Sequence, residues 1–187
     1  MLVADIPFQR YNFSEEDLRY TMSKYVPLNL GANQFYLKEG EISRQLGYVK
    51  KGLLRSYVYD YNANEITQQF YPEGTLIISF DSFNNRVPAQ ENIKAITDAE
   101  LMIITYDDQF ALYDQIPVWK EICKDFSDQQ NHEMLERVRE FQTLSATDRY
   151  RKFCKENPTI LQRATLGHIA SYIGVDIATL SRIRKKK

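Results

Sequence analysis

The stretch from Thr165 to Lys187 constrains the fold of this chain more than any other. Its apolar residues recur three or four positions apart, and they are Leu166, Ile169, Ile173, Ile177, Leu180 and Ile183. This spacing places side chains on one face of a helix, so they can share a small core. Gly174 interrupts the pattern where a first helix would end, because glycine readily adopts the left-handed backbone of a C-terminal cap. Asp176 can cap a second helix, so the stretch predicts two helices joined by a tight turn.

The second predicted helix carries small polar donors followed by cations, which are Thr179, Ser181, Arg182, Arg184 and Lys185 to Lys187. This order suits a helix that lies in the major groove of DNA. We therefore interpret the stretch as a helix-turn-helix with its recognition helix last. The terminal lysines alone would indicate only a solvated basic tail. The interpretation depends on the whole pattern, including Ala170 where the two helices cross and Leu180 in their shared core.

A resemblance to a known family rests on the segment IASYIGVDIATLSRIR. It resembles the C-terminal signature of the Crp/Fnr family of bacterial transcription regulators, which reads I-A-x-x-L-G-(V/I)-x-x-E-T-(L/I)-S-R-x-(R/L). The resemblance implies that Ser181 and Arg182 contact DNA and that Thr179 precedes them on the same helix. Ala178 stands where the family usually has Glu. A carboxylate accepts from the cytosine amino group whereas Ala offers only methyl contact, as to thymine, so the preferred half-site is left open.

Charge is divided unevenly along the chain. Residues 145 to 187 contain ten Lys or Arg against three acidic residues, a net +7, so the preceding residues carry −8 of the overall −1. This asymmetry indicates that the C-terminal part meets polyanions. We expect His168 to face solvent or a phosphate. The predicted DNA-binding residues are Thr179, Ser181, Arg182, Arg184, Lys185, Lys186, Ala178 and His168.

The N-terminal two thirds predict a helix followed by a β-domain. Ser14 and Asp17 form a capping-box pattern ahead of an amphipathic stretch. From Leu28 to about Thr105, short runs rich in Tyr, Val, Ile and Phe alternate with Gly and Asn turns, which is typical of a β-sandwich or jelly roll. Residues 53 to 59 alternate with period two, and a hairpin-length loop precedes residues 66 to 71. The resemblance implies that residues 1–113 form a β-roll sensor domain.

A long helix follows, with one apolar stripe made of Trp119, Ile122, Phe126, Gln130, Met134, Val138 and Phe141. The stripe by itself allows the helix to pack entirely on the β-domain. The resemblance implies instead that residues 114–144 form a dimerisation helix. Its expected contacts with a second copy are Phe126, Gln130, Met134, Val138 and Phe141.

Residues 144 to 147 break the helical pattern and form the expected hinge before the DNA-binding domain, residues 145–187. Ser145 or Thr147 can cap the next helix. We expect that helix to run from Asp148 to Glu156, because Pro158 disfavours helical backbone in the residue before it. The resemblance places a short wing between Pro158 and Thr165.

The β-domain departs from the family's cyclic-nucleotide cassette, which reads roughly G-E-(L/I)-x(8)-R-(S/T)-A. Its Glu takes the ribose hydroxyl and its Arg takes the cyclic phosphate. Here Thr75 follows Gly74, and Ala89 and Gln90 stand where the Arg and the Ser or Thr would lie. We therefore expect no cyclic AMP binding of the usual kind, and an effector pocket that is empty or holds an unknown ligand. The candidate pocket residues are Gly74, Thr75, Arg86, Ala89 and Gln90.

Other classes of site receive little support. No apolar run is long enough to span a membrane, and the N-terminus lacks the apolar region of a signal peptide, so a cytoplasmic location is expected. Cys123 and Cys154 are far apart, which predicts reduced, partly buried thiols rather than a cluster. The two histidines, His132 and His168, lie outside the β-domain, which gives haem no predicted ligand there. The chain carries no catalytic or nucleotide-binding motif, so we expect no enzyme activity, cofactor or metal site.

The expected fold is α+β: an N-terminal double-stranded β-helix (jelly roll) sensor domain, a long dimerisation helix and a winged-helix-type helix-turn-helix domain. The expected function is a sequence-specific DNA-binding transcription regulator that acts as a homodimer on an inverted repeat, with RNA polymerase a further candidate partner. One alternative is a non-catalytic β-roll module that binds a ligand and keeps a vestigial DNA-binding domain. Another is a cupin-like enzyme, which would need clustered His and carboxylate ligands.

Overall fold

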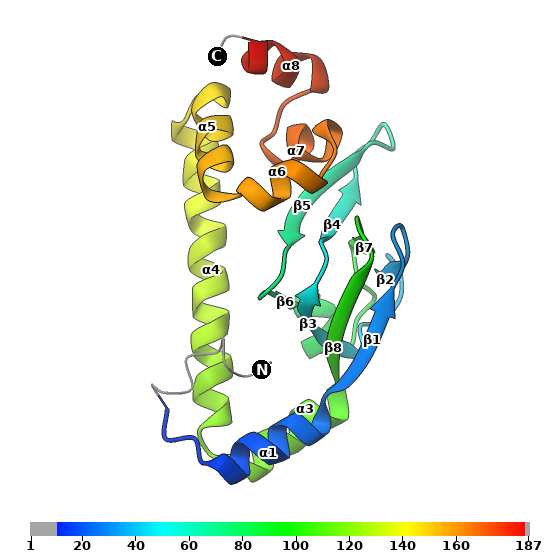
Figure 1. Cartoon of the computed structure of the whole chain (residues 1–187), viewed down its shortest axis with the longest axis vertical. Helices are drawn as coiled ribbons and strands as arrows, with labels where there is room; N and C mark the ends of the chain where they lie inside the picture. Colours follow the sequence, from blue (N-terminus) through cyan, green and yellow to red (C-terminus); the bar gives the residue numbers. More distant parts are fainter. Residues whose placement is uncertain (1–10, 186–187) are drawn as a thin grey trace.

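The computed structural model describes residues 11 to 185, and Figure 1 shows a β-domain flanked by helices. Helices α1 (Glu15–Lys24) and α3 (Tyr106–Gln115) lie at one end, and α5 (Ala146–Glu156), α6 (Pro158–Arg163), α7 (Leu166–Tyr172) and α8 (Ile177–Lys185) lie at the other. Helix α4 (Trp119–Thr143) runs between the two ends. The chain is therefore an α+β protein with its helix-turn-helix stretch at one end.

The β-domain consists of two four-stranded antiparallel sheets. One has the order β1-β8-β3-β6 and the other β2-β7-β4-β5. The strands are β1 (Val26–Leu30), β2 (Phe35–Leu37), β3 (Gln45–Lys51), β4 (Leu54–Tyr59), β5 (Glu65–Tyr71), β6 (Leu76–Ile77), β7 (Asn92–Ala95) and β8 (Ala99–Thr105), with the short helix α2 (Phe80–Asn85) between β6 and β7. Val49, Leu54, Ile77, Ile93 and Leu101 are buried between the sheets. The predicted jelly roll, called the β-roll below, is confirmed.

Strand β4 shows why a period-two pattern does not reveal which face is exposed. Leu54, Arg55, Ser56 and Tyr57 are all buried, although successive side chains point to opposite faces of a sheet. The outer face is covered because Leu53 and Phe70 share a second core with residues of the C-terminal helices, which are Tyr150, Phe153, Ile160, Ile169, Ala170, Ile173 and Leu180. The helix-turn-helix and the β-roll therefore pack against each other.

Local capping signals in the sequence are reproduced in the structure. The Ser14 hydroxyl accepts from the backbone N–H of Asp17, whose carboxylate accepts from the backbone N–H of Ser14, so the predicted capping box of α1 is confirmed. The Ser145 hydroxyl accepts from the backbone N–H of Asp148 and so caps α5, and that helix begins at Ala146 rather than at the predicted Asp148. Thr147 lies inside its first turn.

The prediction of a wing between Pro158 and Thr165 is wrong, because residues 158 to 163 form helix α6. Proline ends α5 as expected, yet it also starts α6. At the first position of a helix its missing N–H would have no partner in any case. A proline therefore marks a helix boundary without saying whether another helix follows.

The apolar stripe of α4 divides into two parts. Trp119 and Ile122 are buried against the β-roll side of the molecule, and Phe126 stacks on Phe80 with ring centroids 6.3 Å apart. Farther along, Met134 is 70% exposed and Val138 is 47% exposed. The alternative in which the whole stripe packs on the β-domain is wrong, because only the first turns of the helix pack within the chain and its second half presents apolar side chains to solvent. Dimerisation through that second half stays a prediction.

No helix within residues 11 to 185 combines the length and apolar character that a membrane span requires. In the same part of the chain, no group of His, Cys, Asp or Glu is arranged to hold a metal ion. Cys123 and Cys154 are both free and half-buried.

Candidate nucleic-acid interface

The turn between α7 and α8 has the predicted local structure. Gly174 adopts a positive φ of 72°. The Asp176 carboxylate accepts from the backbone N–H of Thr179 at 2.7 Å and from its hydroxyl at 2.9 Å, which lowers the pKa of Asp176. The predicted roles of glycine in the turn and of aspartate as the cap are therefore confirmed.

Helix α4 packs against this turn. A Cβ atom built on Gly174 would lie 2.4 Å from Cε1 of Phe141. That separation is shorter than any real contact, so a side chain at position 174 would displace the Phe141 ring as well as strain the backbone. Glycine thus serves both the turn and the close approach of α4.

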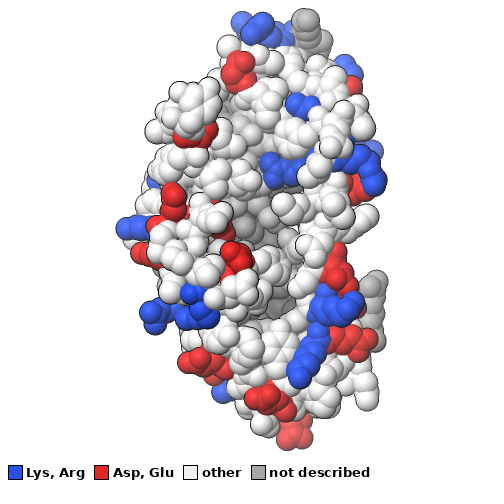
Figure 2. All heavy atoms as spheres, turned by 180° about the vertical axis from the view of Figure 1, so that it is seen from behind, with Lys and Arg blue, Asp and Glu red and all other residues white. Residues whose placement is uncertain are grey.

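The outward face of α8 carries most of the predicted DNA-binding residues. Ala178, Arg182, Arg184 and Lys185 are exposed, and Thr179 and Ser181 are half-buried. The Arg182 guanidinium makes only long hydrogen bonds, 3.4 Å each, to Ala178 O and Thr179 Oγ1. Figure 2 shows a small patch of Lys and Arg side chains at this end of the molecule, with further basic and acidic side chains spread over the rest of the face. Lys186 lies outside the described residues.

His168 does not lie where the sequence predicted. Its Nδ1 is buried and has no hydrogen-bond partner among the described residues. Burial, together with the nearby positive charges of Arg55 and Lys94, lowers the pKa of His168 to about 4. The side chain is therefore neutral at physiological pH and lies toward the β-roll, because α7 packs against β5.

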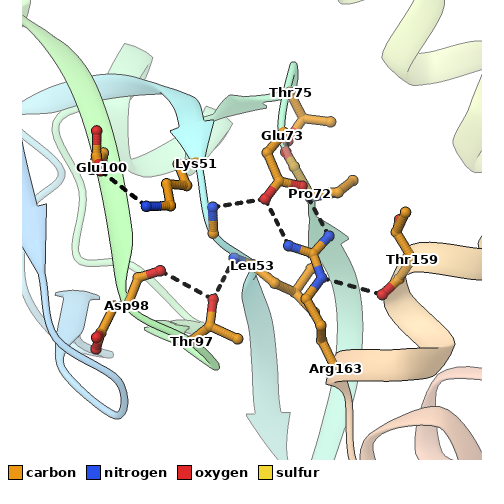
Figure 3. Close-up of polar contacts among 11 residues, drawn as sticks. Lys51, Leu53, Pro72, Glu73, Thr75, Thr97, Asp98, Glu100, Thr159 and Arg163 are labelled. Atoms are coloured by element: carbon orange, nitrogen blue, oxygen red, sulfur yellow. Dashed lines mark hydrogen bonds and ion pairs between the residues drawn. The ribbon is translucent and has the colours of Figure 1, made fainter.

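Polar contacts link the helix-turn-helix to the β-roll. The Ser171 hydroxyl accepts from Thr67 N at 3.1 Å and donates to Thr67 Oγ1 at 3.0 Å. On α6, Arg163 makes two bonds to the Glu73 carboxylate at 2.7 and 2.8 Å, and Gly52 N donates to the same group (Figure 3). The bonds from Arg163 are the main reason why the pKa of Glu73 falls to about 2.

The candidate effector residues use their polar groups locally. Gly74 N donates to Val49 O, and the Thr75 hydroxyl donates to Pro72 O. Arg86 donates to Ser43 O at 2.8 Å and its guanidinium lies over the Tyr106 ring.

Ala89 is buried and Gln90 is exposed. An open hollow of about 470 Å³ is lined by Tyr36, Leu37, Glu41, Ile42, Ser43, Arg44 and Gln45. None of the five candidate residues lines this hollow, although Arg86 and Ala89 donate hydrogen bonds to the backbone of the segment that lines it, at Ser43 O and Glu41 O. The effector assignment therefore stays a prediction.

The predicted dimer contacts separate into two groups. Phe126 packs on Phe80, Gln130 accepts a long bond from Gln69, and Phe141 lies against Gly174. Met134 and Val138 are left exposed, Phe141 remains 40% exposed despite its contact with Gly174, and Leu135, 66% exposed, lies beside Val138. Sequence reasoning missed Leu135 because it is not in the apolar stripe counted from Trp119, whereas it lies three residues before Val138 and hence beside it on the helix surface.

No family model matches the chain, and no curated protein matches it in sequence. Solved structures do match it at low identity. A protein from Eubacterium rectale described as a transcriptional regulator of the Crp/Fnr family is 15% identical, with a TM-score of 0.75 over 96% of this chain and 85% of that one.

The c-di-GMP-responsive global regulator CLP of Xanthomonas campestris is also 15% identical, with a TM-score of 0.73 over 92% of this chain and 91% of its own. FixK2 from Bradyrhizobium japonicum has the same identity and a TM-score of 0.72 over 87% and 83% of the two chains. These matches extend over both the β-roll and the C-terminal helices. This chain therefore has the fold of the Crp/Fnr transcription regulators.

Proposed function

We propose that the chain is a sequence-specific DNA-binding transcription regulator that acts as a homodimer on an inverted repeat. The observation that carries the proposal is α8, a capped helix whose exposed side includes Ala178, Arg182, Arg184 and Lys185 at the end of the molecule. Helices with this composition enter the major groove of DNA, where cations meet phosphates and base edges. The acidic character of residues 1 to 144 keeps the remaining surface away from the polyanion.

Individual roles follow from side-chain chemistry. Arg182 offers a planar pair of donors that matches O6 and N7 of guanine. Thr179 and Ser181 contact bases or phosphates, and Ala178 presents a methyl group, which suits the methyl of thymine. Arg184, Lys185 and Lys186 pair with phosphates and supply affinity without sequence preference.

The homodimer forms through the second half of α4. Met134, Leu135 and Val138 are exposed there, and burying apolar side chains against a second copy is favourable. Two parallel α4 helices place the two copies of α8 on the same side of the dimer. They then enter successive major grooves about 34 Å apart.

The proposal includes a cytoplasmic location, RNA polymerase as a further partner, and an effector other than cyclic AMP bound in the usual way. Thr75, Ala89 and Gln90 offer no charge for a ribose hydroxyl or a cyclic phosphate. No catalytic step, metal or cofactor belongs to the proposed activity.

Selection from a pool of random duplexes tests this function. The full chain is expected to enrich an inverted repeat whose half-sites lie one helical turn apart. Its affinity for that site is expected to fall steeply as the salt concentration rises, because binding of the protein releases cations that are condensed on the DNA. Two results together would contradict the proposal. The chain would enrich no motif, and heparin and random DNA would displace a bound duplex as well as any selected duplex does.

A further inference from the structure

Arg137 contacts three different elements with one side chain. It extends from α4, where it is half-buried. Its guanidinium donates to the backbone carbonyl of Gln68 in β5, and more weakly to that of Thr67 at 3.5 Å. It also donates to the carbonyl of Tyr172, the last residue of α7, at 3.1 Å. One guanidinium therefore joins the long helix, the β-roll and the helix-turn-helix.

The contact with α7 is favourable for two reasons. The last carbonyls of a helix have no partner within the helix, so an external donor satisfies them. The C-terminus of a helix also carries partial negative charge, which attracts a cation. The guanidinium lies over the Tyr172 ring as well, 4.2 Å from its centroid, in the arrangement of a cation–π contact.

A second arginine, Arg149, also links the end of α7 to the end of α4. Arg149 of α5 donates from Nε to Ile173 O at 2.9 Å and from Nη1 to Leu144 O at 2.8 Å. The Phe141 ring contacts both guanidinium groups, with its centroid 5.6 Å from that of Arg137 and 4.9 Å from that of Arg149. Since Phe141 also abuts Gly174, the turn that leads into α8 is fixed to the end of α4.

We propose that Arg137 is a positioning residue that sets the orientation of α8 by fixing α7 to both α4 and β5. The effect of Arg137 on DNA binding rests on the proposed function. In the proposed dimer, the distance between the two recognition helices depends on how each one is held to the α4 helix of its own chain. Lysine cannot replace it. A single ammonium group lacks the planar set of donors that reaches two carbonyls on different elements while the stem stacks on an aromatic ring.

Distances between spin labels test the proposal without DNA. The labels are placed at Tyr61, which is 97% exposed at the tip of the β4–β5 hairpin, and at Lys155 on α5, in full-length chain whose two native cysteines are replaced by serine. Labelled chain is diluted with unlabelled chain so that distances within one protomer are measured. The wild-type residue is expected to give one narrow distribution, and Arg137→Ala a broad or displaced one.

Two further variants make the test specific. Arg139→Ala is the matched control, because Arg139 is exposed on the same helix and its side chain pairs with Glu136, three residues away on that helix. It should leave the distribution unchanged. Arg137→Lys keeps the charge and the apolar stem, so it keeps the fold, yet it should broaden the distribution as Arg137→Ala does. A wild-type distribution in both Arg137 variants would overturn the proposal.

DNA binding supplies a measurement that a loss of stability alone would not change, namely the ratio of the affinities for two operator spacings. If α7 is held correctly only a tenth of the time, apparent affinity for the operator falls about tenfold. Arg137→Lys should also lose discrimination against a site with one base pair inserted between the half-sites, so that the ratio of the two affinities moves toward one. An unchanged ratio would count against the proposal. Failure of wild-type chain to bind any operator would contradict the proposed function, while the label distances would still decide the role of Arg137.

Discussion

Met134→Asp is expected to dissociate the homodimer and, with it, to abolish binding to the inverted repeat. Met134 is the most exposed apolar residue of α4, and Leu135 and Val138 beside it complete the apolar surface. Pairing two copies of the variant would bury two carboxylates that lack cationic partners. An uncompensated buried charge costs about 3–5 kcal/mol, which corresponds to at least a hundredfold rise in the dimer dissociation constant.

Sedimentation at several concentrations measures this effect directly. The matched control is His132→Asp, a residue that is exposed on the same helix and, two positions away, does not share a face with Met134. The control is expected to dimerise like the wild-type chain. The assignment of the α4 surface would be wrong if Met134→Asp stayed dimeric at the concentrations where the wild-type chain does.

Arg182→Ala is expected to cost about 1–3 kcal/mol on the cognate site, a loss of roughly fivefold to more than a hundredfold in affinity. The reason is that Arg182 is exposed on α8 and, among residues 11 to 185, makes only two long hydrogen bonds, so its donors are available to a base. Losing a base contact should also relax specificity at one position of each half-site. Titration of labelled cognate and mutated duplexes measures both effects.

Lys185→Ala separates base contact from phosphate contact. It is expected to weaken cognate and random duplexes alike and to reduce the slope of affinity against salt by about one. Lys186→Ala should behave in the same way. Arg19→Ala, an exposed arginine on α1 that pairs with Glu15, should change neither. Equal losses on cognate and random DNA for Arg182→Ala would contradict its assignment to a base.

The features predicted best from the sequence are those fixed by local chemistry. Gly174 in the turn, and Asp176 and Ser14 as caps, follow from spacing and from backbone preferences of single residues. So does a long helix, predicted over residues 114–144 and observed over Trp119–Thr143. Each depends on neighbours within about one helical turn. The β-roll was also recognisable, because Gly and Asn turns divide the region into short strands.

The features that the sequence did not predict depend on packing between distant segments. His168 was expected to face solvent or a phosphate, but α7 packs on β5 and brings its imidazole close to Arg55 and Lys94. Arg137 carried no recognisable signal, because its partners are backbone carbonyls, which every residue possesses. Phe141 fitted the apolar stripe, yet it lies against the turn at Gly174. Periodicity identifies a buried face without identifying the segment that covers it.

Methylation protection of guanine N7 on the selected duplex tests the central claim most directly, because that atom lies in the major groove. We expect the wild-type chain to protect guanines in two major-groove segments centred one helical turn apart on one side of the duplex, and Arg182→Ala to leave at least one guanine in each segment reactive. Protection confined to the minor groove, or a wild-type pattern with Arg182→Ala, would contradict the claim that α8 reads the DNA.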